Sequence, residues 1–365
     1  MVYYIRFLKP PKFHQEKKNA KQSRPQQKKP VFITALICIT TDLGDDFLAE
    51  DVDLVATWAQ RSPRETIDQS SLKWQAGARQ LSISMGPYSI DHVSQHEAVF
   101  QIRAQTMQDI LGIDTTPLVI SGCSAPFKWQ SEPAEKLIQR EFSIAAGQSI
   151  PSLRIWEETG NSIARHIWDA ALASIIFLDQ SINGTATAIP ILSQLLKVKP
   201  RSSALQAVEL GAGCGIVGIA LATMLDHCNV LLTDLPEVEK IVTRNMDEAR
   251  LQPFSSVRYQ NLDWDEPPSD LCGQPIDLIL VSDCTYNADS LPTLVSVLDR
   301  LVRTSPDALV LVALKRRHES EAVFFDLMKS AAFIAQQTTV PLPSQHDQND
   351  TIELYCYRRE QDDVS

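Results

Sequence analysis

Short apolar runs alternate with helical patterns along the chain from about residue 205 onward. Five of these runs have the length of buried strands: 206–210, 229–233, 256–261, 277–283 and 308–314. Strands that alternate with helices predict an α/β fold with a mostly parallel sheet and helices on both of its faces.

The last two runs, 333–339 and 352–358, are joined by a loop rich in Pro, Gln, Asn and Asp that carries no helical pattern. Such a connection favours a hairpin, so we expect the final strand to be antiparallel. The seven runs together predict a seven-stranded sheet. Sheets of this kind bind ligands at the carboxyl ends of their strands, and we expect the functional site there.

The pattern is harder to interpret upstream of this region. It predicts strands at Val31–Thr40 and 118–121, and helices at 51–59 and 92–110, the second with a polar face. Pro and Ser at 148–152 mark a boundary. We therefore expect an N-terminal extension, residues 31–152, which packs on a core domain of residues 153–360 and helps to choose the substrate.

Charge is distributed unevenly. Residues 1–30 hold nine Lys or Arg and one acid, whereas the remainder holds 25 basic and 44 acidic side chains. The first 30 residues are also polar and rich in Gln, Lys and Pro, so we predict a disordered basic tail. The acidic body argues against non-specific nucleic-acid binding through the core, so we expect nucleic acid to bind through the basic tail if it binds at all. The same acidic surface suits a basic protein substrate.

Seven cysteines are scattered without a C-x-x-C pair, which argues against a zinc knuckle or a redox motif, and we expect no metal. An odd, scattered set suggests reduced, intracellular thiols. The apolar run at 31–39 is too short to span a bilayer and a poor core for a signal peptide. We expect a monomer in the cytoplasm, with the nucleus also open, and no membrane binding.

The most informative segment is VELGAGCGIVG at residues 208–218. A strand that ends in an acid runs into a glycine-rich turn, and an apolar helical pattern begins at Ile216. This arrangement lets the backbone approach a nucleotide-like ligand, because glycine has no Cβ and tolerates positive φ. The start of the helix adds N–H groups for a negatively charged part of the ligand.

Two ligand classes fit this loop. The spacing G-x-G-x-x-G, which ends at Gly218, matches a dinucleotide fingerprint, and Asp234 stands about 20 residues further on. The run E-x-G-x-G-x-G, from Glu209 to Gly215, has its first glycine close behind the strand. That run resembles motif I of the class I, Rossmann-like S-adenosylmethionine (SAM) methyltransferases. The hairpin at the end of the sheet also favours this class over a nicotinamide-binding half.

Four further motifs occur in the order of one family. They are HIWDAA at 166–171, the T-D pair that ends at Asp234, NLDWDE at 261–266 and DCTY at 283–286. With the glycine loop, they resemble methyltransferase family 16, a group of protein-lysine methyltransferases, over about residues 153–358. Each motif is weak by itself, whereas the set is specific.

The resemblance implies roles for individual residues. The cofactor would be bound by Trp168, Glu209, Gly211, Ala212, Gly213, Asp234, Trp264 and Ser282. In such a site Glu209 serves the methionine part of SAM, the glycine loop forms the floor, Asp234 binds the ribose and Trp264 flanks the adenine. Asp283 and Tyr286 would be the catalytic residues, at the mouth where the acceptor amine enters.

These residue types suit transfer to lysine. The acceptor amine must be neutral to attack, although its ordinary pKa is about 10.4, and burial in an aromatic channel lowers that pKa. Asp283 would orient the amine, and a face of Tyr286 would hold the cation. We therefore expect a SAM-dependent protein-lysine N-methyltransferase. A translation elongation factor is the expected substrate, because fungal members of the resembled family act on such factors.

Three alternatives stay open. The first is a methyltransferase for RNA or a small molecule; label that survives protease but not nuclease would favour RNA. The second is a catalytically silent SAM-binding scaffold, which binds the cofactor without turnover. The third is a nicotinamide oxidoreductase, which would bind NAD and not SAM.

Overall fold

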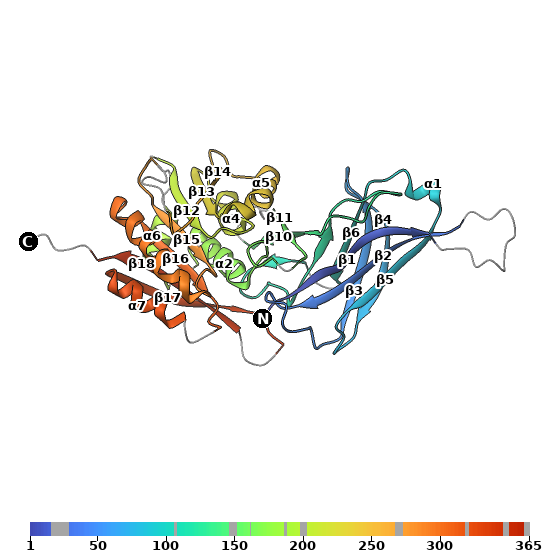
Figure 1. Cartoon of the computed structure of the whole chain (residues 1–365), viewed down its shortest axis with the longest axis horizontal. Coiled ribbons are helices and arrows are strands. Elements are labelled where there is room, and N and C mark those ends of the chain that lie inside the picture. The colour runs from blue at the N-terminus through green and yellow to red at the C-terminus, as the bar shows by residue number, and fades with distance from the viewer. Residues whose placement is uncertain are drawn as a thin grey trace, which may run out of the picture. The chain divides into compact units, whose positions relative to one another are not determined.

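The computed structural model describes ten stretches of the chain: 1–15, 29–105, 108–145, 152–160, 162–185, 188–197, 203–266, 273–317, 321–345 and 350–360. They form two compact units (Figure 1). The first unit comprises Met1–Asp109, Pro117–Glu141 and Trp156–Ile163, and the second comprises Ile110–Thr116, Phe142–Ile155 and Ala164–Ser365. The chain therefore passes between the units several times, and the division does not fall at the single point predicted near residue 152.

The first unit consists mainly of strands. They are β1 (Tyr3–Gln15), β2 (Val31–Thr40), β3 (Val52–Gln60), β4 (Glu65–Trp74), β5 (Leu81–Tyr88), β6 (Ala98–Ala104), β8 (Val119–Ile120) and β9 (Gly122–Ser124), with a short helix α1 (Ile90–Val93). One sheet has the order β5-β2-β1-β8. A second contains β9-β6-β3-β4, and β1 lies against its strands β6 and β9. The unit is thus a sandwich of two mainly antiparallel sheets.

Three short or shared strands complete this description. Strands β10 (Leu137–Ile144) and β11 (Ser152–Glu158) continue the second sheet beyond β9, and the division between the units falls within each of them. Strand β7 (Ile110–Leu111) pairs with the end of β10 in parallel.

Strand β1 corrects the prediction of a disordered tail over residues 1–30. It pairs with β2 in antiparallel fashion along its length and buries Tyr3, Tyr4, Ile5 and Phe7. These apolar side chains supply enough buried surface to order the segment despite its basic composition. Residues 16–28, which hold much of the predicted basic tail, lie outside the described residues.

The two helices predicted in this region are also wrong. Residues 51–59 fall mostly in β3 and residues 92–110 contain β6, and these two strands pair with each other. Strand β3 lies between β4 and β6, so its backbone groups bond on both sides, which outweighs the local helical pattern. The strands predicted at Val31–Thr40 and 118–121 are confirmed by β2 and β8.

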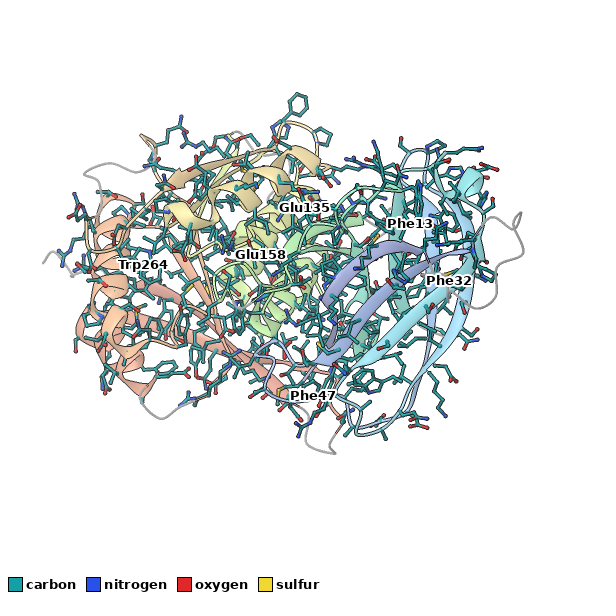
Figure 2. All side chains as sticks on the ribbon, turned by 45° about the vertical axis from the view of Figure 1, so that its right-hand side comes forward. Phe13, Phe32, Phe47, Glu135, Glu158 and Trp264 are labelled. Carbon is teal, nitrogen blue, oxygen red and sulfur yellow. The ribbon has the colours of Figure 1, made fainter. Side chains whose placement is uncertain are left out.

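Two buried groups anchor the first unit. The ring of Trp58 is fully buried, 5.9 Å from the Phe13 ring and 4.6 Å from the Tyr88 ring (Figure 2 labels Phe13). Arg140 and Glu157 are also fully buried, and Arg140 Nε donates to Glu157 Oε1 over 2.7 Å. The Arg140 guanidinium makes a further hydrogen bond, since its Nη1 donates to the Ser121 carbonyl at 2.7 Å.

The second unit alternates strands with helices. Its strands are β12 (Leu205–Leu210), β13 (Cys228–Asp234), β14 (Ser256–Asn261), β15 (Leu278–Ser282), β16 (Leu309–Leu314), β17 (Phe333–Leu342) and β18 (Asp350–Arg359). Its helices are α2 (Asp169–Asn183), α3 (Pro190–Lys197), α4 (Ile216–Met224), α5 (Glu239–Glu248), α6 (Leu291–Thr304) and α7 (Ala322–Ser330), with single 3₁₀ turns η1 (Pro236–Val238) and η2 (Ala288–Ser290).

The sheet of this unit confirms the predicted α/β fold. Among the described residues, seven strands take the order β14-β13-β12-β15-β16-β18-β17. The first five are parallel to one another, whereas β18 runs antiparallel to both β16 and β17. Each of the seven predicted strands falls on one of these, and the predicted antiparallel final strand is β18.

Helices cover both faces of the sheet (Figure 1). On one face, α6 and α7 bury a cluster that includes Val208 and Leu210 of β12 and Val310 of β16. On the other face α4 packs so closely that a Cβ on Gly218 would lie 2.5 Å from Leu232 of β13. Alternate side chains of the central strands therefore enter two different cores. The parallel strands end at a common edge, where the loops that follow β12, β13 and β15 meet.

Candidate active site at the carboxyl edge of the sheet

The glycine loop joins the end of β12 to the start of α4. Gly211 and Gly213 have φ of +66° and +54°, in the left-handed region that side chains with a Cβ rarely adopt. The N–H of Ala212, between them, donates to the Thr233 carbonyl at 3.0 Å. The loop is therefore held to the neighbouring strand β13.

Asp234, at the end of β13, bonds to this loop. Its Oδ2 accepts from the Gly213 N–H at 2.7 Å, and its Oδ1 accepts from the Leu235 N–H at 2.7 Å. Burial raises the pKa of this carboxyl, and the two backbone N–H groups oppose that rise. Asp234 thus stands beside the glycine loop as predicted, with one hydrogen bond made by each oxygen.

Trp264 and Cys284 lie on the Gly211 backbone from two other loops. A Cβ at Gly211 would lie 2.5 Å from Cys284 Sγ and 3.5 Å from Trp264 Cζ2. Trp264 is partly buried against the cluster beneath α6 and α7, and Figure 2 labels it on the second unit. The structure therefore brings Trp264 to the predicted loop, together with Cys284, which was not predicted as a site residue.

Glu209 points to the opposite side of β12 from Val208 and Leu210. Its Oε2 accepts from the Gly218 N–H in the first turns of α4 at 2.7 Å, and its side chain is almost fully buried. Burial, opposed by this hydrogen bond, raises the pKa of Glu209 to about 8. The structure thus places this acid against the start of α4, directly after the glycine loop.

Ser282 ends β15, the strand next to β12. Its Oγ is buried and makes no hydrogen bond with the described residues. An unsatisfied hydroxyl costs free energy unless a ligand or water completes it. This makes Ser282 a candidate contact for a bound molecule at the edge.

Asp283 follows Ser282 with φ of +55°. Its carboxylate is not open to an acceptor amine as predicted, since it binds Arg317 in a fork, with Nη1–Oδ1 at 2.7 Å and Nη2–Oδ2 at 2.8 Å. The Arg317 guanidinium also lies 5.4 Å from the centre of the Trp168 ring, just before α2. The structure thus brings Asp283 and Trp168 together through Arg317, which the sequence analysis did not assign to the site.

Tyr286 is the most exposed of the predicted residues, at 57%. Partial burial, with the nearby charges of Cys284, Asp234 and Asp283, raises the pKa of its phenol. The hydroxyl is therefore neutral at physiological pH, and the ring stands at the rim of the site.

Arg317 and Cys284 are the groups that the sequence interpretation missed. A signal for Arg317 existed: the basic run after β16 must end at the same edge as Asp283, because β15 and β16 are parallel neighbours. For Cys284 the signal was its position inside the DCTY motif. Neither signal reveals the partner of the side chain.

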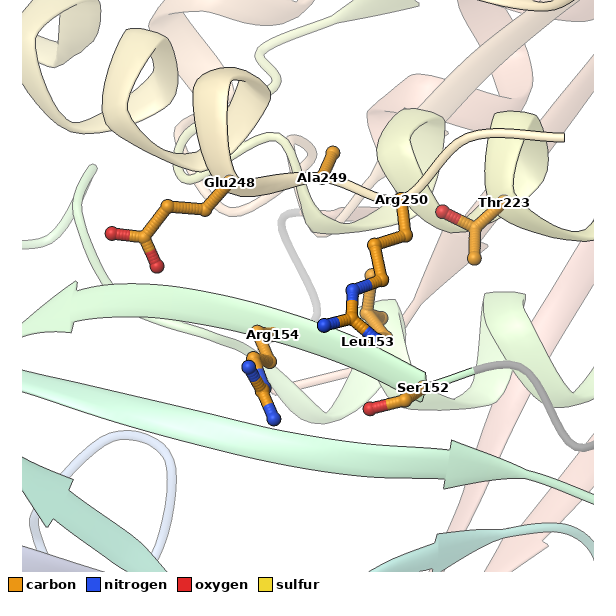
Figure 3. A pocket seen from close by; sticks show the side chains of 7 residues that line it. All are labelled: Ser152, Leu153, Arg154, Thr223, Glu248, Ala249 and Arg250. Carbon is orange, nitrogen blue, oxygen red and sulfur yellow. The ribbon is translucent and has the colours of Figure 1, made fainter. Parts of the chain in front are cut away.

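A small cavity of about 10 Å³ lies elsewhere in this unit (Figure 3). It is lined by Ser152, Leu153, Arg154, Thr223, Glu248, Ala249 and Arg250. These residues surround the ends of α4 and α5, close to where β13 and β14 begin, and the volume holds about one water molecule. The cavity is therefore at the amino edge of the sheet and does not belong to the candidate site.

Comparison with known proteins identifies the family. The model of the lysine methyltransferase family matches residues 148–331, half of the chain. The chain is 24% identical to the UPF0665 family protein C23C4.06c of Schizosaccharomyces pombe over 330 residues, 88% of this chain and 91% of that protein. The resemblance to methyltransferase family 16 is thus confirmed.

Two further relatives match a shorter part. The protein-lysine N-methyltransferase EFM6 of Saccharomyces cerevisiae is 29% identical over 220 residues, 54% of this chain and 82% of the relative. The protein N-lysine methyltransferase METTL21A of Danio rerio is 31% identical over 186 residues, 50% of this chain and 74% of the relative. The glycine loop bonded to Asp234 and these matches together show that the chain belongs to the lysine methyltransferase family.

Proposed function

We propose that this enzyme methylates a lysine side chain of a protein with SAM as the donor, and that the protein is a translation elongation factor. The family match and the relatives named as lysine methyltransferases support the lysine acceptor. The observation that best supports the position of the cofactor is the bond from Gly213 to Asp234 in the loop whose Gly211 lies against Trp264. The proposal that the substrate is an elongation factor is supported by the resemblance to fungal members of the family.

Membership of the family indicates SAM as the cofactor, and the groups at the edge fit it. Each Asp234 oxygen keeps a lone pair beyond its bond to a backbone N–H, which suits the two ribose hydroxyls. The buried Ser282 hydroxyl needs a partner, which a polar group of the cofactor supplies. The flat ring of Trp264 beside Gly211 suits an adenine.

These fits support the following assignments. We assign the floor of the site to Gly211, Ala212 and Gly213, the ribose to Asp234, the adenine to Trp264, a polar contact to Ser282, and the side of the cofactor to Trp168. For Glu209 we propose an indirect role in which its bond to Gly218 holds the start of α4, which directly follows the loop that faces the methionine part.

SAM, when bound, supplies a methyl group on a sulfonium, whose departure as a neutral sulfide needs no proton. The residues of the chain then have to hold the acceptor in line and keep it neutral, and positioning by itself supplies several kcal/mol. Tyr286, exposed at the rim, offers a ring to the arriving ammonium. Asp283 orients the site while paired with Arg317, so we assign it an orienting role rather than that of a free base.

The test is incubation of the purified protein with methyl-labelled SAM and a cell extract, beside Asp283→Ala. Asp289→Ala, an exposed acid of the same loop, is the matched control. We expect one discrete labelled protein band with the wild type and the control, and none with Asp283→Ala. Mass spectrometry of that band names the substrate.

Other outcomes separate the alternatives. Label that is lost with nuclease and kept with protease indicates RNA. SAM binding without label in any fraction indicates a small-molecule enzyme or a silent scaffold. A labelled band that is not an elongation factor contradicts only the proposed substrate.

We also propose that residues 31–152 serve substrate choice. The relatives named as lysine methyltransferases match only about half of this chain, and every assigned cofactor contact belongs to the second unit, which supports a separate role for the first. Cross-linking of the labelled substrate to the full chain tests this. Cross-links confined to residues after 163 contradict it.

We further propose that the enzyme is a cytoplasmic or nuclear monomer. No disulfide joins the six cysteines that the structure describes, which fits a reducing compartment. Within the described part of the chain, no helix is long and apolar enough to cross a membrane. Light scattering of the purified protein and imaging of a fluorescent fusion test the two statements.

A further inference from the structure

Arg317 lies between two residues of the proposed methyl-transfer site. One edge of its guanidinium binds both oxygens of Asp283, at 2.7 and 2.8 Å, and its carbon lies 5.4 Å from the centre of the Trp168 ring. A planar guanidinium that forks onto a carboxylate and covers an aromatic ring restricts the orientation of both partners. Asp283 follows β15 and Trp168 precedes α2, so one side chain connects two distant parts of the sequence.

The Arg317 contact is shielded from solvent. The Asp283 side chain is 4% exposed and that of Arg317 is 21% exposed. Removing one partner of such a pair leaves a buried charge uncompensated. The neighbouring Arg316 provides a contrast, because it binds Glu353 at 2.8 Å with a side chain that is 47% exposed.

The Asp283 backbone is constrained as well. Its positive φ turns the chain away from β15 toward Tyr286, and its N–H donates to the Ala313 carbonyl of β16 at 2.8 Å. A strained turn of this kind persists only where its surroundings hold it. The fork from Arg317 is one of those restraints, so it influences where the loop and Tyr286 stand.

Lys315 makes a similar connection two residues earlier. Its Nζ lies 3.2 Å from Asp169 Oδ2, and the Asp169 side chain is fully buried at the first position of α2. Lys315 and Arg317, which follow β16, thus hold the start of α2 and the end of β15 at one edge of the sheet.

We propose that Arg317 is a positioning residue for methyl transfer, which holds the Asp283 carboxylate and the Trp168 ring in the orientation that the acceptor and the cofactor require. The inference rests on the proposed function. Arg317 acts through these two residues and not on the reacting atoms. Its loss therefore lowers turnover more than SAM affinity, since the Gly213–Asp234 bond stands on other strands.

The experiment compares the full-length wild type with Arg317→Met, which removes the charge, and Arg317→Lys, which keeps the charge and loses the fork. Arg316→Met is the matched control. SAM affinity is measured by calorimetry. Transfer is measured as the initial rate of label entering the band that the wild type labels in extract, at saturating SAM.

We expect Arg317→Met to lower the transfer rate about tenfold or more while the Kd for SAM changes by less than about threefold. Arg317→Lys should recover part of the rate, and Arg316→Met should match the wild type. The double variant Asp283→Asn, Arg317→Met removes both charges and keeps the test valid if the single variant does not fold. We expect it to fold and to remain slow.

Three results overturn the inference: full transfer by folded Arg317→Met, full transfer by the double variant, or equal losses of SAM affinity and transfer. Full transfer by the double variant means that Arg317 only neutralises a buried charge. If the wild type binds SAM and labels no protein, the proposed function fails and this inference fails with it. A labelled band unaffected by Arg317→Met overturns the inference alone.

Discussion

The backbone N–H of Gly213 donates to Asp234 Oδ2 over 2.7 Å and joins residues that stand 21 positions apart. The bond connects the loop after β12 to the end of β13, before any ligand enters. Because Asp234 is also held by the Leu235 N–H, its carboxylate has one orientation from the start. A preorganised acceptor loses little entropy when it binds a ligand, which is why this pair is central to the cofactor assignment.

Replacement of Asp234 tests that assignment. Asp234→Ala should weaken SAM binding about tenfold or more, because a charge-assisted hydrogen bond contributes about 1.5–3 kcal/mol. Calorimetry measures the change. Asp247→Ala, which removes an exposed acid on α5, should leave the affinity unchanged. Equal affinities for both variants would refute the ribose role.

A methyl group at Gly211 tests the close approach of Trp264 and Cys284. Gly211→Ala combines strain at φ of +66° with a Cβ placed 2.5 Å from Cys284 Sγ. Gly77→Ala, at φ of +78° with open space around it, isolates the strain, which is about 1–2 kcal/mol. We expect denaturant unfolding to show a larger loss for Gly211→Ala, and SAM binding to be lost only there. Similar losses of stability would mean that the crowding around Gly211 relaxes at no cost.

Replacement of Ser282 should affect protein stability and SAM affinity in different ways. Its Oγ has no hydrogen-bond partner among the described residues, so Ser282→Ala should leave the free energy of unfolding unchanged or raise it by up to about 1 kcal/mol. If the hydroxyl contacts the cofactor, the same variant should bind SAM about fivefold more weakly. Thermal unfolding without ligand and calorimetry with SAM give the two quantities. A stability loss with unchanged affinity would reverse the assignment.

Glu209 predicts a pH dependence of stability. Its pKa rises from 4.5 in the unfolded chain to about 8 in the fold, so the folded state binds more protons between these values. The stability contributed by this group is complete below about pH 4.5 and falls as pH rises toward 8, by at most about 1.4 kcal/mol per pH unit. Glu209→Gln mimics the protonated form and should remove this slope. Parallel curves for the two proteins in urea unfolding from pH 5 to 8 would show that Glu209 is ionised in the fold.

The central strands β12, β13, β15 and β16 were predictable because helices separate them and both of their faces are buried, so each appears in the sequence as a compact apolar run. In the first unit the same reasoning failed at β6, because the window 92–110 has helical spacing and yet contains the strand Ala98–Ala104. Pairing with β3 decides its conformation, and no local pattern contains that information. Strand β1 was missed because composition averaged over 30 residues hid the apolar group from Tyr3 to Phe7.

The site shows the same limit. Motif spacing indicated which loops reach the carboxyl edge, and the structure does place Gly211, Asp234 and Trp264 together. Spacing did not show that the Asp283 carboxylate is taken by Arg317 or that Glu209 bonds to the start of α4. Each of these relations joins a side chain to a group on another element, and it depends on pleat direction and on rotamers.

Strand β18 lies between β16 and β17 although it follows both in the chain. During synthesis, β17 therefore emerges with no neighbour in the sheet, and β16 keeps one edge unpaired until residues 350–359 leave the ribosome. The sheet is completed by insertion of its last strand and not by addition at its rim. A nascent chain halted before Asp350 would leave β17 without a partner and one edge of β16 unpaired, which are open strand edges of the kind that promote aggregation.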